Sequence, residues 1–434
     1  MSNRYSGGEV APRLRTVQGG EPIRGPQTQK ATIMSVPPED DGRAAARTRF
    51  RIFTRRPRAG RRTGRAFQSL LAAGALAALG VSAGADSASA ATARPAGPPI
   101  TGVTWHQLTL INGWVSGQSQ SPGDGIPAWT VRSGVVYLTG SVMQTSGTNG
   151  EFAVLPQAAR PTHVLYMPVS VLGQGTHGWI IVYPSGAMYA MGNPYSAAQG
   201  FTGLAGISYP AKAMAMSTLS LENGWQSSDA QYGTGDPSYS VSNGMVYLSG
   251  SLNQPAGDIQ VFGVLPLAAR PAHTMYLNVY GFDGGVTELE IDTNGNMLAY
   301  EGGAQQYTSL AGVSFPVASA ATNQITLING WQSAQPSYGT GDPSYSVKNG
   351  VVHLSGSLLQ PPAPGDTQDF AVLPVAARPK YYLYINTEVS PPDSIAAAGD
   401  IVISPDGRLY SNSYPLSESE AFTSLAGISY PVGS

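Results

Sequence analysis

Short runs that alternate apolar and polar residues dominate the chain from about residue 104 onward. The run that begins at Val351 (Val-Val-His-Leu-Ser-Gly-Ser-Leu) follows Asn349-Gly350, and a shorter run, Tyr-Ser-Val, precedes that pair. Strand, two-residue turn and strand is the pattern of a β-hairpin, because Asn-Gly readily adopts the positive φ angles of the tight turn. Matching runs begin at Val135 and Met245, so the same hairpin is predicted three times.

A second hairpin is predicted in every copy. In the last copy Asp400-Ile-Val-Ile403 turns at Ser-Pro-Asp-Gly407, and the other copies turn at Thr-Asn-Gly295 and Pro-Ser-Gly186. With a strand between the hairpins and a closing Gly-Ile/Val-Ser-Tyr/Phe-Pro strand, each copy holds about seven or eight short strands. The pattern predicts an all-β fold of three tandem antiparallel β-sandwich domains, jelly-roll-like, after a disordered N-terminal leader.

Three sequence signatures mark each copy. Asn-Gly-Trp begins it, Leu-Pro-x-Ala-Ala-Arg-Pro lies in its middle, and Leu-Ala-Gly closes it. The Asn-Gly-Trp starts are 111 and 106 residues apart, which exceeds the roughly 20–50 residues of solenoid and propeller units. Each copy is long enough for a core of its own. The predicted repeats are residues 104–210, 217–316 and 324–434.

The N-terminal part has the features of an export signal. Residues 1–66 are rich in Arg, Pro and Gly and are predicted to be a disordered basic leader. Residues 67–90 contain an apolar run, Leu70 to Val81, and end in the small-residue cleavage motif Ala-Ser-Ala90. Residues 91–103 form a linker. We expect a secreted or cell-surface protein, with an uncut N-terminal anchor as the alternative.

Charge and cysteine content narrow the function. Residues 1–66 carry 14 Arg and one Lys against five acids, whereas residues 92–434 carry 9 basic and 20 acidic side chains. An acidic body argues against nucleic acid as a partner, because phosphate binding needs clustered Lys and Arg. It leaves cell-surface carbohydrate or another envelope polymer as a partner. The chain has no cysteine, hence no disulfide, thiolate nucleophile or cysteine-bound metal.

The histidines do not form a catalytic or metal-binding pattern. His163 and His273 are equivalent, but the third copy has Tyr381 at that position, and His353 replaces a tyrosine of the other copies. A histidine that exchanges with tyrosine on a strand indicates packing. His-Glu-x-x-His is also missing. We therefore expect no metal, no cofactor and no catalytic residue.

The loop Tyr-Gly-Thr-Gly-Asp-Pro-Ser-Tyr occurs in the second and third copies and offers candidate ligand-binding residues. Tyrosine rings stack on sugars and aspartate binds hydroxyl groups, although Asp before Pro is ordinarily a turn former. A glycosidase needs two carboxylates roughly 5–10 Å apart, and a second acid does not recur at a fixed offset. The candidate residues are Tyr232, Asp236, Tyr239, Tyr338, Asp342 and Tyr345.

Two sets of recurring residues are expected to be structural anchors. The tryptophans should pack in a core or between domains, and the arginines should cap a loop or pair with a carboxylate, with an anion or sugar contact as the alternative. They are Trp114, Trp225, Trp331, Arg160, Arg270 and Arg378. Recognition is expected in loops that differ between copies. These are residues 143–151, 253–260 and 359–369, and residues 171–178, 280–287 and 387–399.

The order of these motifs resembles the C-terminal tip domains of phage tail fibres and receptor-binding proteins. That resemblance implies β-sandwich heads, often trimeric, that bind host-surface glycans. Here three tips follow one another without a shaft and behind an export leader, which suggests a bacterial secreted protein that uses the same module. It implies either a trimer of chains or a pseudo-trimer within one chain.

The sequence therefore predicts a secreted, non-catalytic recognition or adhesion protein. The first alternative is a structural tail-fibre or tip component of a phage or phage-derived particle. The second is a glycoside hydrolase with an unrecognised carboxylate site.

Overall fold

The computed structural model describes residues 103–119, 121, 123–172, 176–301, 303–361, 367–391 and 396–434. The leader and signal segment predicted in residues 1–90, and nearly all of the predicted linker, lie outside these residues. The fold is all-β, and every pairing between named strands is antiparallel. This confirms the predicted fold class. Among the helices described, none has the length and apolar character that a bilayer crossing requires.

The first repeat folds into three sheets. The first has the order β1-β3-β4-β11, the second β10-β5-β2 and the third β6-β9-β8-β7. Its strands are β1 (His106–Gln107), β2 (Trp114–Ser116), β3 (Ala128–Arg132), β4 (Val135–Thr139), β5 (Ser141–Gln144), β6 (Glu151–Val154), β7 (Leu165–Val169), β8 (His177–Val182), β9 (Ala187–Asn193), β10 (Thr202–Gly203) and β11 (Ser208–Pro210). Helix α1 (Tyr195–Gly200) precedes β10.

The second and third repeats each fold into three sheets of their own, with the same arrangement as in the first. The second contains β12 (Ser217–Thr218), β13 (Gln226–Ser227), α2 (Asp229–Tyr232), β14 (Ser238–Ser242), β15 (Met245–Ser249), β16 (Ser251–Asn253), β17 (Val261–Val264), β18 (Met275–Tyr280), β19 (Val286–Ile291), β20 (Asn296–Tyr300), β21 (Thr308–Ser309) and β22 (Ser314–Pro316). The third contains β23 (Asn323–Gln324), β24 (Gln332–Ser333), α3 (Gln335–Tyr338), β25 (Ser344–Lys348), β26 (Val351–Ser355), β27 (Ser357–Leu359), β28 (Asp369–Val372), β29 (Leu383–Glu388), β30 (Ala398–Ile403), β31 (Arg408–Asn412), α4 (Leu416–Ala421), β32 (Thr423–Ser424) and β33 (Ser429–Pro431).

The predicted first hairpin is present in each repeat. In the third, Val347 pairs with Val352 across β25 and β26, and the turn residues Asn349 and Gly350 have φ angles of 50° and 74°. These positive angles are what a tight two-residue hairpin turn needs. The local signal in the sequence was therefore sufficient to locate this element.

The number of strands per repeat was underestimated. In the described residues each repeat has eleven strands rather than seven or eight. A single glycine with positive φ divides one predicted strand in two: Gly140, Gly250 or Gly356, with φ of 82°, 91° and 89°. The chain bends there and passes from the first sheet into the second. The bent pair of sheets and the third sheet enclose the core.

Each repeat has its own apolar core. Phe152, Phe262 and Phe370 are fully buried at equivalent positions, and each lies about 6 Å from the tryptophan of its Asn-Gly-Trp motif. Burial of such a side chain contributes about 1.5–3 kcal/mol. Each sandwich is therefore held by a core cluster drawn mainly from its own repeat.

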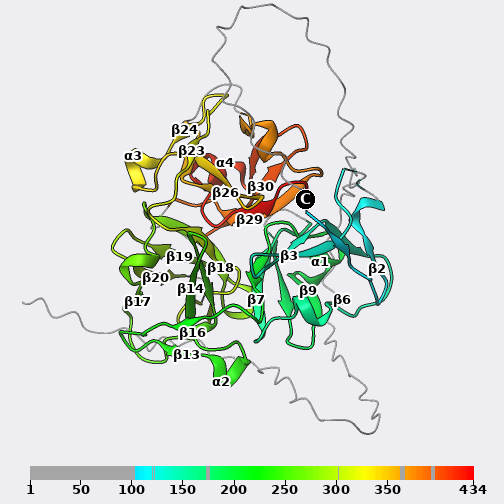
Figure 1. Ribbon diagram of the computed structural model, residues 1–434, viewed down its shortest axis with the longest axis horizontal. Helices are drawn as coiled ribbons and strands as arrows, with labels where there is room; N and C mark the ends of the chain where they lie inside the picture. The colour runs from blue at the N-terminus through cyan, green and yellow to red at the C-terminus, as the bar shows by residue number, and fades with distance from the viewer. Residues whose placement is uncertain are drawn as a thin grey trace, which may run out of the picture. The chain divides into compact units, whose positions relative to one another are not determined.

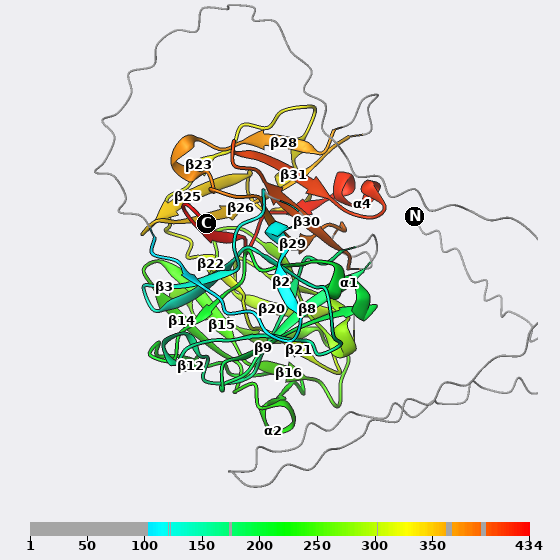
Figure 2. The ribbon, with the colours of Figure 1, turned by 90° about the vertical axis from the view of Figure 1, so that its right-hand side faces the viewer.

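The three repeats contact one another in a closed cycle. A backbone N–H just before the middle strand of each repeat donates to a loop carbonyl of the next, and the third repeat donates back to the first. The bonds are Val164 N to Gly233 O (2.9 Å), Thr274 N to Gly339 O (3.2 Å) and Tyr382 N to Gly123 O (3.0 Å). Figure 1 shows β7, β18 and β29 next to one another in the middle, where they contact in pairs. In Figure 2 the third repeat, yellow to red, again lies above the other two.

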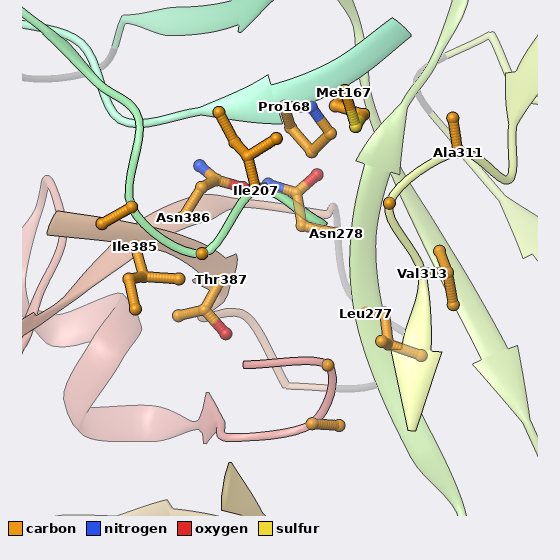
Figure 3. A pocket seen from close by; sticks show the side chains of 15 residues that line it. Met167, Pro168, Ile207, Leu277, Asn278, Ala311, Val313, Ile385, Asn386 and Thr387 are labelled. Carbon is orange, nitrogen blue, oxygen red and sulfur yellow. Dashed lines mark hydrogen bonds between the residues drawn. The ribbon is translucent and has the colours of Figure 1, made fainter. Parts of the chain in front are cut away.

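A small cavity of about 70 Å³ lies where the three repeats meet. Each repeat contributes equivalent positions: an Ala-Gly pair and two residues of β7, β18 or β29. Figure 3 shows Pro168, Asn278 and Asn386, which occupy the same position in their strands. Apolar side chains such as Met167 and Leu277 supply the rest of the wall. The repeats therefore share a central junction with approximate threefold character.

Candidate functional site

A cleft of about 500 Å³ lies between the first and third repeats. The first repeat contributes the residues that follow β7, Ser170 to Leu172, together with Phe201. The third repeat contributes one face of β29, β30 and β31. The volume of the cleft lies in the range of small-molecule sites, roughly 300–1,000 Å³.

Three polar residues of the third repeat form a row across the floor of the cleft. In the strand register, Asn386 of β29 pairs with Asp400 of β30, which pairs with Asn412 of β31. Directly paired residues project from the same face of a sheet, so an amide, a carboxyl and an amide lie side by side. The first repeat has Pro168, Trp179 and Met191 in that row. The second repeat has Asn278, Glu288 and Tyr300 there. The row is therefore polar in the second and third repeats and largely apolar in the first.

Aromatic rings border this polar row. Tyr384 packs edge-on against Phe201 of the first repeat, with ring centroids 5.1 Å apart. Tyr414 lies at the rim and is 60% exposed. Burial, and then the nearby carboxyl of Asp124, raise the pKa of Tyr384 to about 12. Its hydroxyl is therefore neutral and able to donate a hydrogen bond at neutral pH.

The Asp400 carboxyl has a raised pKa. Its removal from water raises its pKa to about 7, and a hydrogen bond from the Ser170 side chain acts in the opposite direction. The side chain still lines the cleft. Asp400 can thus present either a neutral or a charged carboxyl to a ligand near neutral pH.

One position explains why a cleft is open at this junction. Five residues after Leu165, Met275 and Leu383, the three repeats carry Ser170, Tyr280 and Glu388 respectively. The small Ser170 side chain leaves the space between the first and third repeats open. Tyr280 fills the corresponding space between the first and second repeats, and Glu388 is buried within its own repeat.

Tyr280 packs into an aromatic cluster at the junction of the first and second repeats. Its ring stacks on Tyr166 at 5.2 Å and lies 5.4 Å from the ring of Trp179. Glu388 is fully buried, and its carboxylate accepts hydrogen bonds from the Ser390 hydroxyl (2.6 Å) and the Ala397 N–H (3.1 Å). Burial raises the pKa of Glu388 to about 7, against the effect of these hydrogen bonds.

A second departure from the repeat pattern lies behind the same cleft. Thr234 and Thr340 each share a buried hydrogen bond with a serine seventeen residues later, at 2.5 Å. The first repeat has Asp124 in this place, and the Ser141 hydroxyl donates to its carboxylate at 2.8 Å. Asp124 is 2% exposed, and burial raises its pKa. Its carboxyl is thus part of the wall near Tyr384 rather than open to the cleft.

The residues proposed from the sequence as ligand contacts lie elsewhere. Tyr232 and Tyr338 pack edge-on against Tyr307 and Phe422 of their own repeats, at 4.7 and 5.1 Å. Tyr239 and Tyr345 are partly buried against the cores of theirs. A ligand role for these tyrosines stays a prediction.

Asp236 and Asp342 line two separate grooves between successive repeats. The grooves have volumes of about 260 and 490 Å³, and each also contains a histidine, His163 or His273. The loop glycines Gly235 and Gly341 lie so close to these imidazoles that an added Cβ would come within 2.7 and 2.5 Å of them. The Tyr-Gly-Thr-Gly-Asp-Pro-Ser-Tyr loops therefore form junctions between repeats, and the structure does not bring their aspartates together.

The recurring tryptophans and arginines bind backbone carbonyls of their own repeats. The tryptophans are 3–4% exposed, and their indole N–H groups donate at 2.8–2.9 Å. Each arginine Nε donates to the leucine carbonyl of its Leu-Pro motif, at 2.9–3.1 Å. These contacts are made by Trp114, Trp225, Trp331, Arg160, Arg270 and Arg378. The arginines thus hold the Leu-Pro loop of each repeat, and the tryptophans hold the segment just before β6, β17 or β28.

Sequence reasoning missed the residues that line the cleft, although it gave one useful signal. The variable stretches 171–178 and 387–399 were proposed for recognition, and Val171, Thr176 and Gly399 border the cleft. Asn386, Asp400 and Asn412 became visible only through the strand register.

No group of three or more potential metal ligands occurs among the residues that the structure describes. Comparison with protein-family models, with curated proteins and with solved structures finds no match to this chain.

Proposed function

We propose that this chain is a recognition protein that binds a carbohydrate in the cleft between its first and third repeats. The observation that supports this most directly is the row of Asn386, Asp400 and Asn412 beside aromatic rings. Sugars present apolar C–H faces that pack on aromatic rings, and hydroxyl groups that bind amides and carboxyls. Pockets with a few placed polar groups in an apolar wall are the usual form of small-ligand sites.

The surrounding scaffold supports this proposal. The resemblance to phage tip modules implies glycan-binding heads that work as trimers, and the cyclic contacts between the three repeats supply a comparable arrangement within one chain. The export signal expected from the sequence would bring such a protein to cell-surface polymers. The trimer-like arrangement of the repeats and the expected export signal both support an adhesion or recognition role outside the cell.

A hydrolytic role has less support than binding. A carboxyl that keeps its proton near neutral pH, such as Asp400, suits a general acid, but a glycosidase needs a second carboxylate across the bond. Asp400 is the single carboxyl among the described residues that line the cleft, and Asp124 is buried against Ser141. Asp236 and Asp342, on which the hydrolase alternative was based, line other grooves.

The test is a glycan array followed by calorimetry with the full chain. Asn412→Ala and Tyr414→Ala should each weaken binding of the best glycan at least tenfold, because they remove a polar contact and an aromatic contact from the cleft. Glu222→Gln, which neutralises an exposed acid outside the cleft, is the control and should bind as the wild type does. The proposal fails if no glycan binds, or if both cleft variants keep wild-type affinity. The particle-component alternative predicts a folded protein that stays bound to purified particles and binds no free glycan.

A further inference from the structure

We propose that the cleft selects a cationic amino sugar and that the Asp400 carboxylate binds its ammonium group. This inference rests on the proposed carbohydrate-binding function and names the class of sugar. It concerns the middle member of the polar row, which lies between the side-chain amides of Asn386 and Asn412.

The charged groups of the cleft support a cationic ligand. The described residues that line the cleft include Asp400 but no lysine, arginine or histidine. Asp124 places a second carboxyl behind Tyr384. An anionic sugar such as a uronic acid would therefore meet the Asp400 carboxyl, with that of Asp124 buried behind the wall, and like charges across an interface oppose binding.

Within the described part of the chain, Asp400 has no cationic partner. Both ion pairs found among the described residues join Arg408 to other aspartates, Asp369 and Asp406. Ionisation of a desolvated carboxyl is unfavourable unless a counter-charge is supplied. An ammonium group of the ligand would supply it, and the pKa of Asp400, raised to about 7 by burial, would fall in the complex.

The neighbouring groups suit the rest of such a sugar. The side-chain oxygens of Asn386 and Asn412 accept hydrogen bonds from Asn278 (2.6 Å) and Gln368 (3.1 Å). Their side-chain NH2 groups can donate to hydroxyl groups of a sugar. The rings of Tyr384 and Tyr414 offer apolar surface, and the Tyr384 hydroxyl stays neutral. The cleft thus combines one anionic position with neutral polar and aromatic contacts. A single ammonium on an otherwise neutral ring matches this set.

The experiment compares three oligosaccharides of equal length on the full chain, at neutral pH and physiological salt. These are β-1,4-linked glucosamine with free amines, its N-acetylated counterpart, and a polyuronate. We expect the free amine to bind at least tenfold more tightly than the acetylated sugar, and the polyuronate not to bind. Asp400→Asn should lower the affinity of the free amine to that of the acetylated sugar and change the latter less than threefold. Glu222→Gln, at an exposed acid outside the cleft, should preserve the preference, which excludes general attraction to an acidic surface.

The outcomes separate the two proposals. If neutral sugars bind in the cleft but amine and acetyl forms bind equally, or if Asp400→Asn keeps the preference, the amino-sugar inference is wrong and the carbohydrate site stands. If no sugar binds the wild type, both are wrong. Should Asp400→Asn not fold, Ser170→Tyr provides the second variant, since filling the cleft from its opposite wall must abolish binding of the free amine.

Discussion

The side-chain amide of Asn278 donates a hydrogen bond of 2.6 Å to the side-chain oxygen of Asn386, across the boundary between the second and third repeats. The equivalent residue of the first repeat is Pro168, which has no such group. All three line the small central cavity. The central junction is therefore polar on two sides and apolar on the third.

Asn278→Ala should lower the free energy of unfolding by about 1–3 kcal/mol, because it leaves the Asn386 side chain without its partner at the centre of the molecule. The double variant with Asn386→Ala should cost less than the sum of the two single variants. Urea denaturation of the four proteins measures this coupling. Asn294→Ala, in an exposed turn, is the control and should change stability by less than about 0.5 kcal/mol. Strict additivity would show that the hydrogen bond contributes nothing.

Ser170→Tyr should close the cleft, since Tyr280 fills the corresponding space in the second repeat. The variant should keep its thermal stability and lose sugar binding by at least tenfold. Ser170→Ala is the control, because it leaves the cleft open and should retain most of the affinity. Melting temperature and calorimetry on the same samples separate a filled cleft from an unfolded protein. A folded tyrosine variant with wild-type affinity would place the ligand elsewhere.

His353 should make the protein less stable at acidic pH. Burial, and then the nearby charge of Lys348, lower its pKa from 6.5 to about 4, so the folded state favours neutral imidazole. The unfolded chain binds the proton more readily between these values. Stability is therefore retained above pH 6.5 and falls as the pH drops from 6.5 toward 4, by up to about 3 kcal/mol.

His353→Tyr is the matched variant, because tyrosine occupies this position in the other two repeats. It should remove that part of the acid sensitivity while leaving stability at pH 8 within about 1.5 kcal/mol. Chemical denaturation between pH 4 and 8 gives the comparison. Parallel pH profiles for the two proteins would mean that His353 does not control the acid response.

Gly356→Ala should be strongly destabilising. This glycine bends the chain between β26 and β27 with a φ of 89°, and an added Cβ would lie 2.5 Å from the backbone oxygen of Asp342. Gly339→Ala is the control: its φ is 68°, but no atom lies within 4 Å of the added Cβ. The control should cost about 1–2 kcal/mol from the left-handed backbone alone. A difference in unfolding free energy between the two variants measures the clash, and equal costs would argue against it.

The cyclic contacts lead us to expect a compact monomer in solution. Light scattering should give the mass of one chain, and the X-ray scattering profile should be that of a compact particle. Three separated beads, or a stable trimer of chains, would contradict closure within the chain. Tyr382→Pro removes the N–H that bonds to Gly123 and should loosen the junction of the third and first repeats.

Local chemistry made much of the fold predictable. Asn349-Gly350 places a hairpin because its turn angles depend on two neighbouring residues. The bend at Gly356 escaped prediction because an alternating pattern continues through it, and the reason for the glycine is a backbone 14 residues away in sequence, at Asp342.

The cleft could not be predicted in the same way. Ser170 and Asp400 are 230 residues apart, and they meet only because the third repeat closes onto the first. Asn386, Asp400 and Asn412 lie in one row because of how β29, β30 and β31 pair. That pairing register is not visible in the sequence. The Tyr-Gly-Thr-Gly-Asp-Pro-Ser-Tyr loops looked like a site because they recur, yet what they share is a position at a junction.

The linkage of three modules in one polypeptide has a consequence for how the junctions can differ. In a homotrimer, one gene specifies every copy, so a substitution that opens a cleft at one junction opens it at all three. Dilution also separates the subunits of a homotrimer. Here Ser170, Tyr280 and Glu388 are encoded independently, and the ring closes within a single molecule at any concentration. Three repeats in one chain can therefore differ at their junctions. Two junctions can hold the cycle of repeats closed while the third binds a ligand.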